Sequence, residues 1–233
     1  MPDWLPRVVV VALLILAGCQ PPQPVPVVPE ASVVGSTAYL IFNAPIGPAS
    51  RDLLIADIDK FRNAGARDID LGINSPGGDI DAAQGIVDYM RRQHDQNGIT
   101  FNAYNVGLVA SAATYIFLHA QNRYSQERGA FLFHAAGAVS NGPASAEKLR
   151  EQADRLDAYE RLMRATLKER SKLTDSEAQT YVRRTVVLNA DDARRDGIID
   201  GIAAYPAPKG AMVLTIGVKP SQPPQGARPA GSP

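Results

Sequence analysis

Strand-like and helix-like patterns of apolar residues alternate between residues 36 and 218, and this alternation restricts the fold more than any other feature of the chain. Ile69, Leu71 and Ile73 are separated by single polar or small residues, which is the period of a strand. Similar patterns predict strands at 39–42, 99–106 and 131–133 and helices at 54–61, 80–90, 109–119 and 145–170. Because alternating strands and helices form a mainly parallel sheet covered by helices, we expect an α/β domain.

Charge and composition exclude several classes of protein. The 24 Lys and Arg residues are matched by 24 Asp and Glu residues, so the chain lacks the basic surplus of a nucleic-acid-binding protein. Three histidines and one cysteine are too few for a zinc finger, an iron–sulfur cluster or an internal disulfide. We therefore expect no nucleic-acid partner, no metal and no cofactor.

The N-terminus has the organisation of a secretory signal. A short basic start is followed by an apolar run at 8–16 and then by small residues before Cys19. The run is shorter than the roughly 20 apolar residues that a membrane-spanning helix needs. Residues 16–19, Leu-Ala-Gly-Cys, resemble the bacterial lipobox, which implies that residues 1–18 are removed and Cys19 is lipidated. An ordinary signal peptide with an incidental cysteine is the alternative.

Proline-rich segments flank the predicted domain. Residues 19–35 are expected to form an extended linker, and residues 219–233 to be disordered, which leaves 36–218 as one domain. By resemblance to other lipoproteins, Gln20 rather than an aspartate after the cysteine favours the outer membrane. We therefore expect the domain to face the periplasm, attached to the membrane by lipid without crossing it.

Three segments at predicted strand ends carry residues suited to catalysis. Gly77 and Gly78 end the run 74–78, and their amides can approach a bound oxygen closely. Ser111 stands among small residues where a strand turns into a helix, beside free backbone amides. His134 ends an apolar strand, and an imidazole is suited to act as a general base. A tight turn, a serine in a small-residue helix and a strand-end histidine are the structural alternatives.

In this order and spacing the segments resemble the proteolytic subunit of Clp proteases and its periplasmic relatives, in the crotonase-like superfamily. The matching runs are Asn-Ser-Pro-Gly-Gly at 74–78, Gly-x-x-Ala-Ser-Ala at 107–112 and two apolar residues before histidine at 132–134. Residues 188–200 are similar to the family's closing motif. The resemblance covers about residues 38–204 and implies a repeated β-β-α superhelix with a mainly parallel sheet.

The resemblance implies a serine peptidase that cleaves peptide bonds through an acyl-enzyme. Ser111 would be the nucleophile and His134 its general base. The backbone amides of Gly78, or Gly77, and Ala112 would form the oxyanion hole. The substrate would be a peptide lying extended beside a strand.

The chain departs from the family at the third catalytic residue. An ungapped alignment places Thr185 where the family has an aspartate. A threonine can hold a histidine ring by one hydrogen bond, but it cannot stabilise the imidazolium by charge. A Ser–His dyad, a substitute carboxylate at Asp191 or Asp192, and loss of catalysis with retained binding all remain open.

Two functions follow from this resemblance. One is an envelope serine hydrolase that acts without ATP on short or unfolded peptides, and the other is a non-catalytic peptide-binding or scaffold protein. Acyl-CoA chemistry of the crotonase type also uses an oxyanion hole, but it needs a cofactor that is not expected in the periplasm.

Relatives also imply a homo-oligomer formed through helices like that at 145–170. His119 is expected to be a helix C-terminal residue rather than a ligand.

Overall fold

The computed structural model describes residues 33–137 and 145–217. The expectations placed on Cys19, on residues 1–18 and on residues 219–233 lie outside this range, as does most of the predicted linker.

The described residues form one mixed sheet with helices. The elements in chain order are β1 (Thr37–Asn43), α1 (Pro48–Asn63), β2 (Asp68–Ser75), α2 (Ile80–Asn97), β3 (Thr100–Ala110), α3 (Ala112–Leu118), β4 (Asn122–Ser125), β5 (Ala130–Phe133), α4 (Ala146–Arg170), α5 (Asp175–Arg183), β6 (Val186–Leu188), α6 (Ala190–Arg195), β7 (Gly201–Ile202) and β8 (Val213–Gly217). The main path through the sheet is β6-β5-β3-β2-β1-β8, and β4 pairs with β3 and β7. Among these pairs only β5–β6 is antiparallel, so the predicted α/β class with a mainly parallel sheet is confirmed.

The helix expected at 109–119 begins three residues later than predicted. Val109 and Ala110 belong to β3, where they pair with Phe131 and Leu132 of β5. An apolar run of this length fits a buried strand as well as a buried helix, and the pairing with β5 decides for the strand. As a consequence, Ser111 lies at the junction between β3 and α3.

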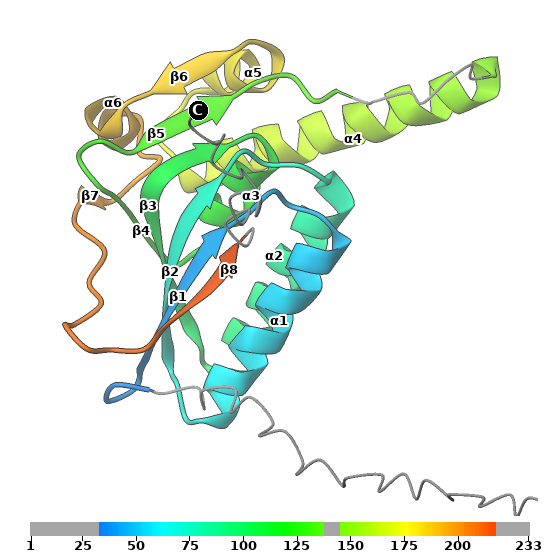
Figure 1. Cartoon of the computed structure of the whole chain (residues 1–233). Coiled ribbons are helices and arrows are strands. Elements are labelled where there is room, and N and C mark those ends of the chain that lie inside the picture. The colour runs from blue at the N-terminus through cyan, green and yellow to red at the C-terminus, as the bar shows by residue number, and fades with distance from the viewer. Residues whose placement is uncertain (1–32, 138–144, 218–233) are drawn as a thin grey trace, which may run out of the picture. The chain divides into compact units, whose positions relative to one another are not determined.

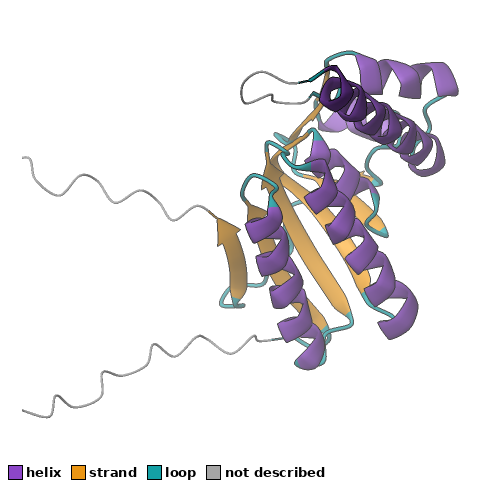
Figure 2. Ribbon diagram, turned by 90° about the vertical axis from the view of Figure 1, so that its right-hand side faces the viewer, coloured by secondary structure: helices purple, strands orange, loops and turns teal. Residues whose placement is uncertain are grey.

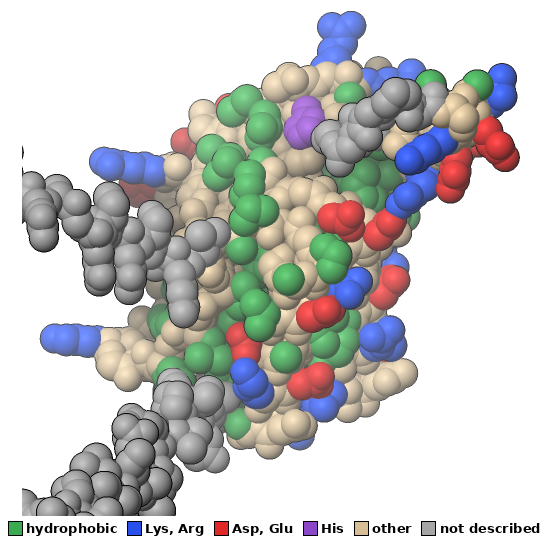
Figure 3. Space-filling model, turned by 45° about the vertical axis from the view of Figure 1, so that its right-hand side comes forward, with side chains coloured by type: hydrophobic (Ala, Val, Ile, Leu, Met, Phe, Trp, Pro, Cys, Tyr) green, Lys and Arg blue, Asp and Glu red, His purple; other side chains and the backbone are tan. Residues whose placement is uncertain are grey.

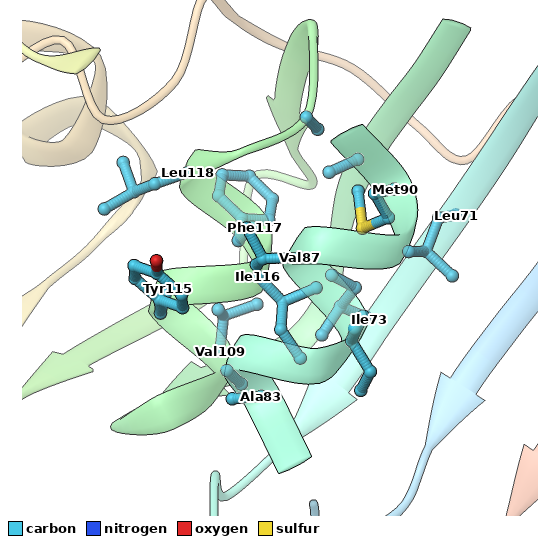
Figure 4. Close-up of a cluster of buried hydrophobic side chains, with 14 of the residues drawn as sticks. Leu71, Ile73, Ala83, Val87, Met90, Val109, Tyr115, Ile116, Phe117 and Leu118 are labelled. Carbon is cyan, nitrogen blue, oxygen red and sulfur yellow. The ribbon is translucent and has the colours of Figure 1, made fainter. Parts of the chain in front are cut away.

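The hydrophobic core lies between the sheet and the helices that cover one of its faces. Figure 2 shows helices running along the strands on this face. Leu71 and Ile73 of β2 meet the α2 side chains Val87 and Met90, and Phe117 of α3 packs into the same cluster (Figure 4). Because α3 is buried along its whole length, its first residue, and Ser111 before it, are held in a fixed place.

Charged side chains of both signs are interspersed on the face of the molecule seen in Figure 3. In the described residues, no helix combines the length and the apolar character that crossing a membrane requires.

His119 ends α3, as the sequence predicts. Its Nδ1 donates to the carbonyl of Tyr115 at 2.8 Å, and its Nε2 lies 2.8 Å from the guanidinium of Arg91. Burial, together with the nearby charges of Arg91 and Arg170, lowers the pKa of His119 to about 4, against the opposing effects of the Tyr115 carbonyl and Glu169. The ring is therefore neutral in the folded protein at neutral pH.

This neutral ring makes stability depend on pH. The unfolded chain binds a proton at His119 near pH 6.5 and the folded chain only near pH 4, so acid favours unfolding across this window. We expect the free energy of unfolding to lose about 1–3 kcal/mol from this group between pH 7.5 and pH 4.5. Urea titrations of the wild type and His119→Gln at both pH values measure it. The variant should lose less stability in acid, whereas His94→Gln, at an exposed histidine, should behave like wild type; equal losses in all three proteins would contradict the prediction.

Candidate active site

Ser111 has a strained backbone that turns the chain sharply from β3 into α3. Its φ of 53° and ψ of −127° make it the one non-glycine residue with a positive φ in the described part of the chain. Its N–H donates to the carbonyl of Leu132 at 2.8 Å. Its own carbonyl accepts from the amide and the hydroxyl of Thr114, at 2.9 and 2.6 Å. Strain of this kind persists only where the surroundings fix it, and it is characteristic of functional sites.

The glycine turn after β2 lies directly against this serine. A Cβ atom on Gly77 would be 2.6 Å from the carbonyl oxygen of Ala110, 2.7 Å from the Cβ of Ser111 and 2.9 Å from the amide nitrogen of Ala112. Gly77 also has a φ of 88°. Only glycine satisfies both the conformation and the close approach. The structure therefore brings the first two sequence segments together in space.

The backbone amides of Gly77, Gly78 and Ala112 differ in their hydrogen-bond partners. The Gly77 N–H donates to Ser75 Oγ at 3.2 Å, which engages it within the turn. The Gly78 N–H has no hydrogen-bond partner among residues 33–137 and 145–217. Ala112 is the first residue of α3, where the amide has no intrahelical acceptor. Of the candidate donors, Gly78 and Ala112 are therefore the better placed to receive an oxyanion.

His134 follows the last residue of β5 and is exposed. Its Nδ1 lies 2.7 Å from the carbonyl oxygen of Ala135, and since a carbonyl only accepts, Nδ1 carries the proton. Nε2 is then the acceptor nitrogen of the neutral ring, which is the tautomer that a general base requires. No hydrogen bond between this ring and Ser111 Oγ is present in the described structure.

Ser111 and His134 open onto one cavity of about 390 Å³. The lining of the cavity is Gly78, Ile80, Ser111, Thr114, Phe133, His134, Ala135, Ala136, Gly137, Tyr159, Glu160, Met163, Tyr181 and Val182. The nucleophile and base candidates therefore share a space with an oxyanion-hole candidate and with side chains of α4 and α5. Within the described ranges, no group of three or more His, Cys, Asp or Glu side chains is arranged to hold a metal ion.

Thr185 precedes β6, which runs antiparallel to β5. Phe133 pairs with Val186, so continuing the register by one residue sets Thr185 opposite His134. Thr185 is exposed, and the structure gives it no side-chain hydrogen bond among the described residues.

Asp191 and Asp192 lie on α6, beyond the other end of β6. Leu188, the last residue of β6, pairs with Phe131 at the start of β5, so α6 begins on the side of β5 away from His134. Asp191 accepts from Arg194 at 3.1 Å and Asp192 from Arg195 at 2.5 Å. The structure thus does not bring either carboxylate to His134.

Sequence reasoning did not single out Thr114, Tyr159 or Glu160. Thr114 lies three residues after Ser111, a spacing at which a threonine hydroxyl reaches back to a preceding carbonyl, so the sequence held a usable signal for it. Tyr159 and Glu160 reach the cavity from the middle of α4, where the sequence shows only a polar helix with apolar positions. No local pattern marks them.

A comparison with protein families settles the wider relationship. The model of the Clp protease family matches residues 37–206, which is most of the chain. The chain belongs to the Clp protease family. Membership agrees with the mainly parallel sheet and points to a serine peptidase, and members of the family typically assemble into oligomers and bind peptides. The match begins at the first residue of β1 and includes Ser111, His134 and Thr185.

Proposed function

We propose that this Clp protease family member is a serine peptidase in which Ser111 is the nucleophile and His134 the general base. The observation that carries the proposal is the strained turn at Ser111, which opens onto the same cavity as His134 and Gly78. A non-glycine residue at a φ of 53° is strained, and such strain clusters at active sites.

The reaction divides into acylation and deacylation. Ser111 Oγ attacks the peptide carbonyl while its proton passes to Nε2 of His134. The imidazolium then gives this proton to the departing amine, and the C–N bond breaks to leave an acyl-serine. Water repeats the sequence on the ester, and the acid product leaves with Ser111 restored.

Two backbone amides would stabilise the negative oxygen of each tetrahedral intermediate. Gly78 and Ala112 are the donors that the geometry favours, and Gly77 supports the turn through Ser75 Oγ. Amides held in place before the reaction do not reorganise as charge develops, and one such donor contributes about 10²–10³ in kcat.

Among the described residues, no ion pair joins His134 to a carboxylate that would stabilise the imidazolium. Its Nδ1–H is held by the carbonyl of Ala135, and Thr185 is the residue opposite in the strand register. We therefore propose a Ser–His dyad, with turnover limited by the missing carboxylate.

The location and assembly of the protein follow from the sequence as proposals. Lipidation of Cys19 would tether the domain to the outer membrane on its periplasmic side, where it would cleave short or unfolded peptides without ATP. Self-association would use the first half of α4. All buried side chains of this helix lie at or after Tyr159, and Leu149 is 51% exposed.

A fluorophosphonate probe tests the peptidase directly. The probe phosphonylates only an activated serine, so the purified full chain should be labelled at Ser111, and Ser111→Ala should abolish the labelling. Circular dichroism of the variant verifies its fold. Lack of labelling in a well-folded wild type would exclude the proposed activity.

The alternative function is a non-catalytic peptide-binding protein. The observation that favours it is that, among the described residues, no hydrogen bond or ion pair joins His134 to a carboxylate, and Asp191 and Asp192 pair with arginines instead. In that case Ser111→Ala should complement a deletion strain as well as wild type does, while a catalytic role requires that it fail.

A further inference from the structure

Among the residues that the structure describes, Glu160 is the one carboxylate that lines the cavity next to Ser111. It projects from α4, and its side chain is 22% exposed. The other ionisable side chains of the lining are His134 and two tyrosines, Tyr159 and Tyr181. Burial is the main cause that raises the pKa of both tyrosines, so they stay neutral near pH 7. Glu160 is therefore the acidic group of this lining that can pair with a cation.

The Glu160 carboxylate has a weak ion pair with one arginine, Arg183. Arg183 Nε is 3.6 Å from Glu160 Oε2, and the arginine side chain is 63% exposed. Arg183 does not line the cavity; it lines a neighbouring cleft between α4 and α5, and Glu160 lines both spaces. Because the arginine is exposed and the two atoms are 3.6 Å apart, this ion pair contributes little to stability, and Glu160 can still accept a second cation that enters from the cavity.

The remaining walls suit a long aliphatic chain that ends in a cation. Met163 and Val182 are apolar. The rings of Phe133 and Tyr181 also line the cavity, with their centroids 5.0 Å apart. Lysine and arginine side chains bury their methylene groups along such surfaces while the charged end finds a partner. Aromatic faces also attract cations.

We propose that this cavity binds the side chain of a lysine or arginine whose carbonyl Ser111 attacks, and that Glu160 recognises its positive charge. The inference rests on the proposed peptidase function and adds its substrate class: basic peptides. Glu160 would be a specificity-determining residue, because it contacts the substrate side chain and not the reacting carbonyl.

The experiment compares two peptidyl diphenyl phosphonates that are identical except for lysine or norleucine at the reacting position. Each phosphonylates the serine with loss of phenol, and norleucine keeps the methylene chain without the charge. With the full chain, we expect the lysine reagent to react about tenfold faster. Glu160→Gln should bring this ratio to about 1, whereas Glu151→Gln, at an exposed glutamate of α4 outside the cavity, should keep it.

A fluorophosphonate without a peptide separates this inference from the function on which it rests. It should label wild type and Glu151→Gln at equal rates, and it should still label Glu160→Gln. Equal or absent reaction of the two peptide reagents with a protein that the fluorophosphonate labels would overturn the basic preference and leave the peptidase intact. A third outcome would also overturn the basic preference: Glu160→Gln reacts more slowly with all three reagents, and the pH dependence of its labelling rate changes. Glu160 would then act through His134 and not through the substrate side chain. Absence of all labelling would reject the peptidase itself.

Discussion

Replacing His134 by alanine should lower kcat/KM for peptide cleavage by at least about 10³-fold. Without the imidazole, no group takes the proton from Ser111 Oγ or returns it to the leaving amine, and general acid–base catalysis alone contributes about 10²–10⁴. In serine proteases the nucleophile and base act as one unit, so loss of either removes most of the catalysis. Steady-state cleavage of a fluorogenic peptide, at saturating and limiting concentrations, measures the effect.

His94 provides the matched control. It is an exposed histidine near the end of α2, with Nδ1 bound to the carbonyl of Ile99, and it lines no part of the cavity. His94→Ala should keep the wild-type rate. Partial recovery of His134→Ala in added imidazole would support the proton-transfer role. A folded His134→Ala protein with wild-type activity would show that Ser111 is activated in another way, or that a contaminant cleaves the peptide.

Replacing Thr185 by aspartate should raise kcat by about 10²-fold. The strand register sets this position opposite His134, so a carboxylate there could contact Nδ1–H and stabilise the imidazolium. In trypsin-like proteases, replacing the triad aspartate by asparagine lowers turnover about 10⁴-fold, and a newly placed carboxylate should recover part of such a factor. Burst and steady-state kinetics at neutral pH measure the gain.

Thr185→Asn separates charge from hydrogen bonding. The amide oxygen can accept from the ring but carries no charge, so this variant should remain within a few-fold of wild type. If the aspartate and asparagine variants have equal rates and normal stability, the carboxylate does not reach the imidazole, and the register argument fails. Because Thr185 is exposed, neither substitution should disturb the core.

Most strands and helices of the domain's first half follow from apolar periodicity, but β4 was not predicted. The strand at 69–73 appears as β2, three residues longer than predicted, and the helix at 80–90 appears as α2, which continues for seven more residues to Asn97. The short elements after α4, and β8, carry too few apolar residues to be marked by a pattern. Tertiary pairing defines them: β6 is a strand because it pairs with β5, and β8 because it pairs with β1.

The sequence by itself determined the α/β class and the candidate residues Ser111, His134, Gly77 and Gly78, because periodicity, glycine pairs and strand-end polar residues are local properties of the chain. Only the tertiary structure decided which of them meet. The pairing of β3 with β5 carries Ser111 toward His134, and the packing of α4 and α5 brings Glu160 to the same cavity. The tertiary structure also separates Asp191 and Asp192 from His134. Because β6 runs antiparallel to β5, its last residue lies away from His134, and α6 follows from there. Contacts between segments far apart in sequence depend on the packing of the whole sheet, which no local pattern encodes.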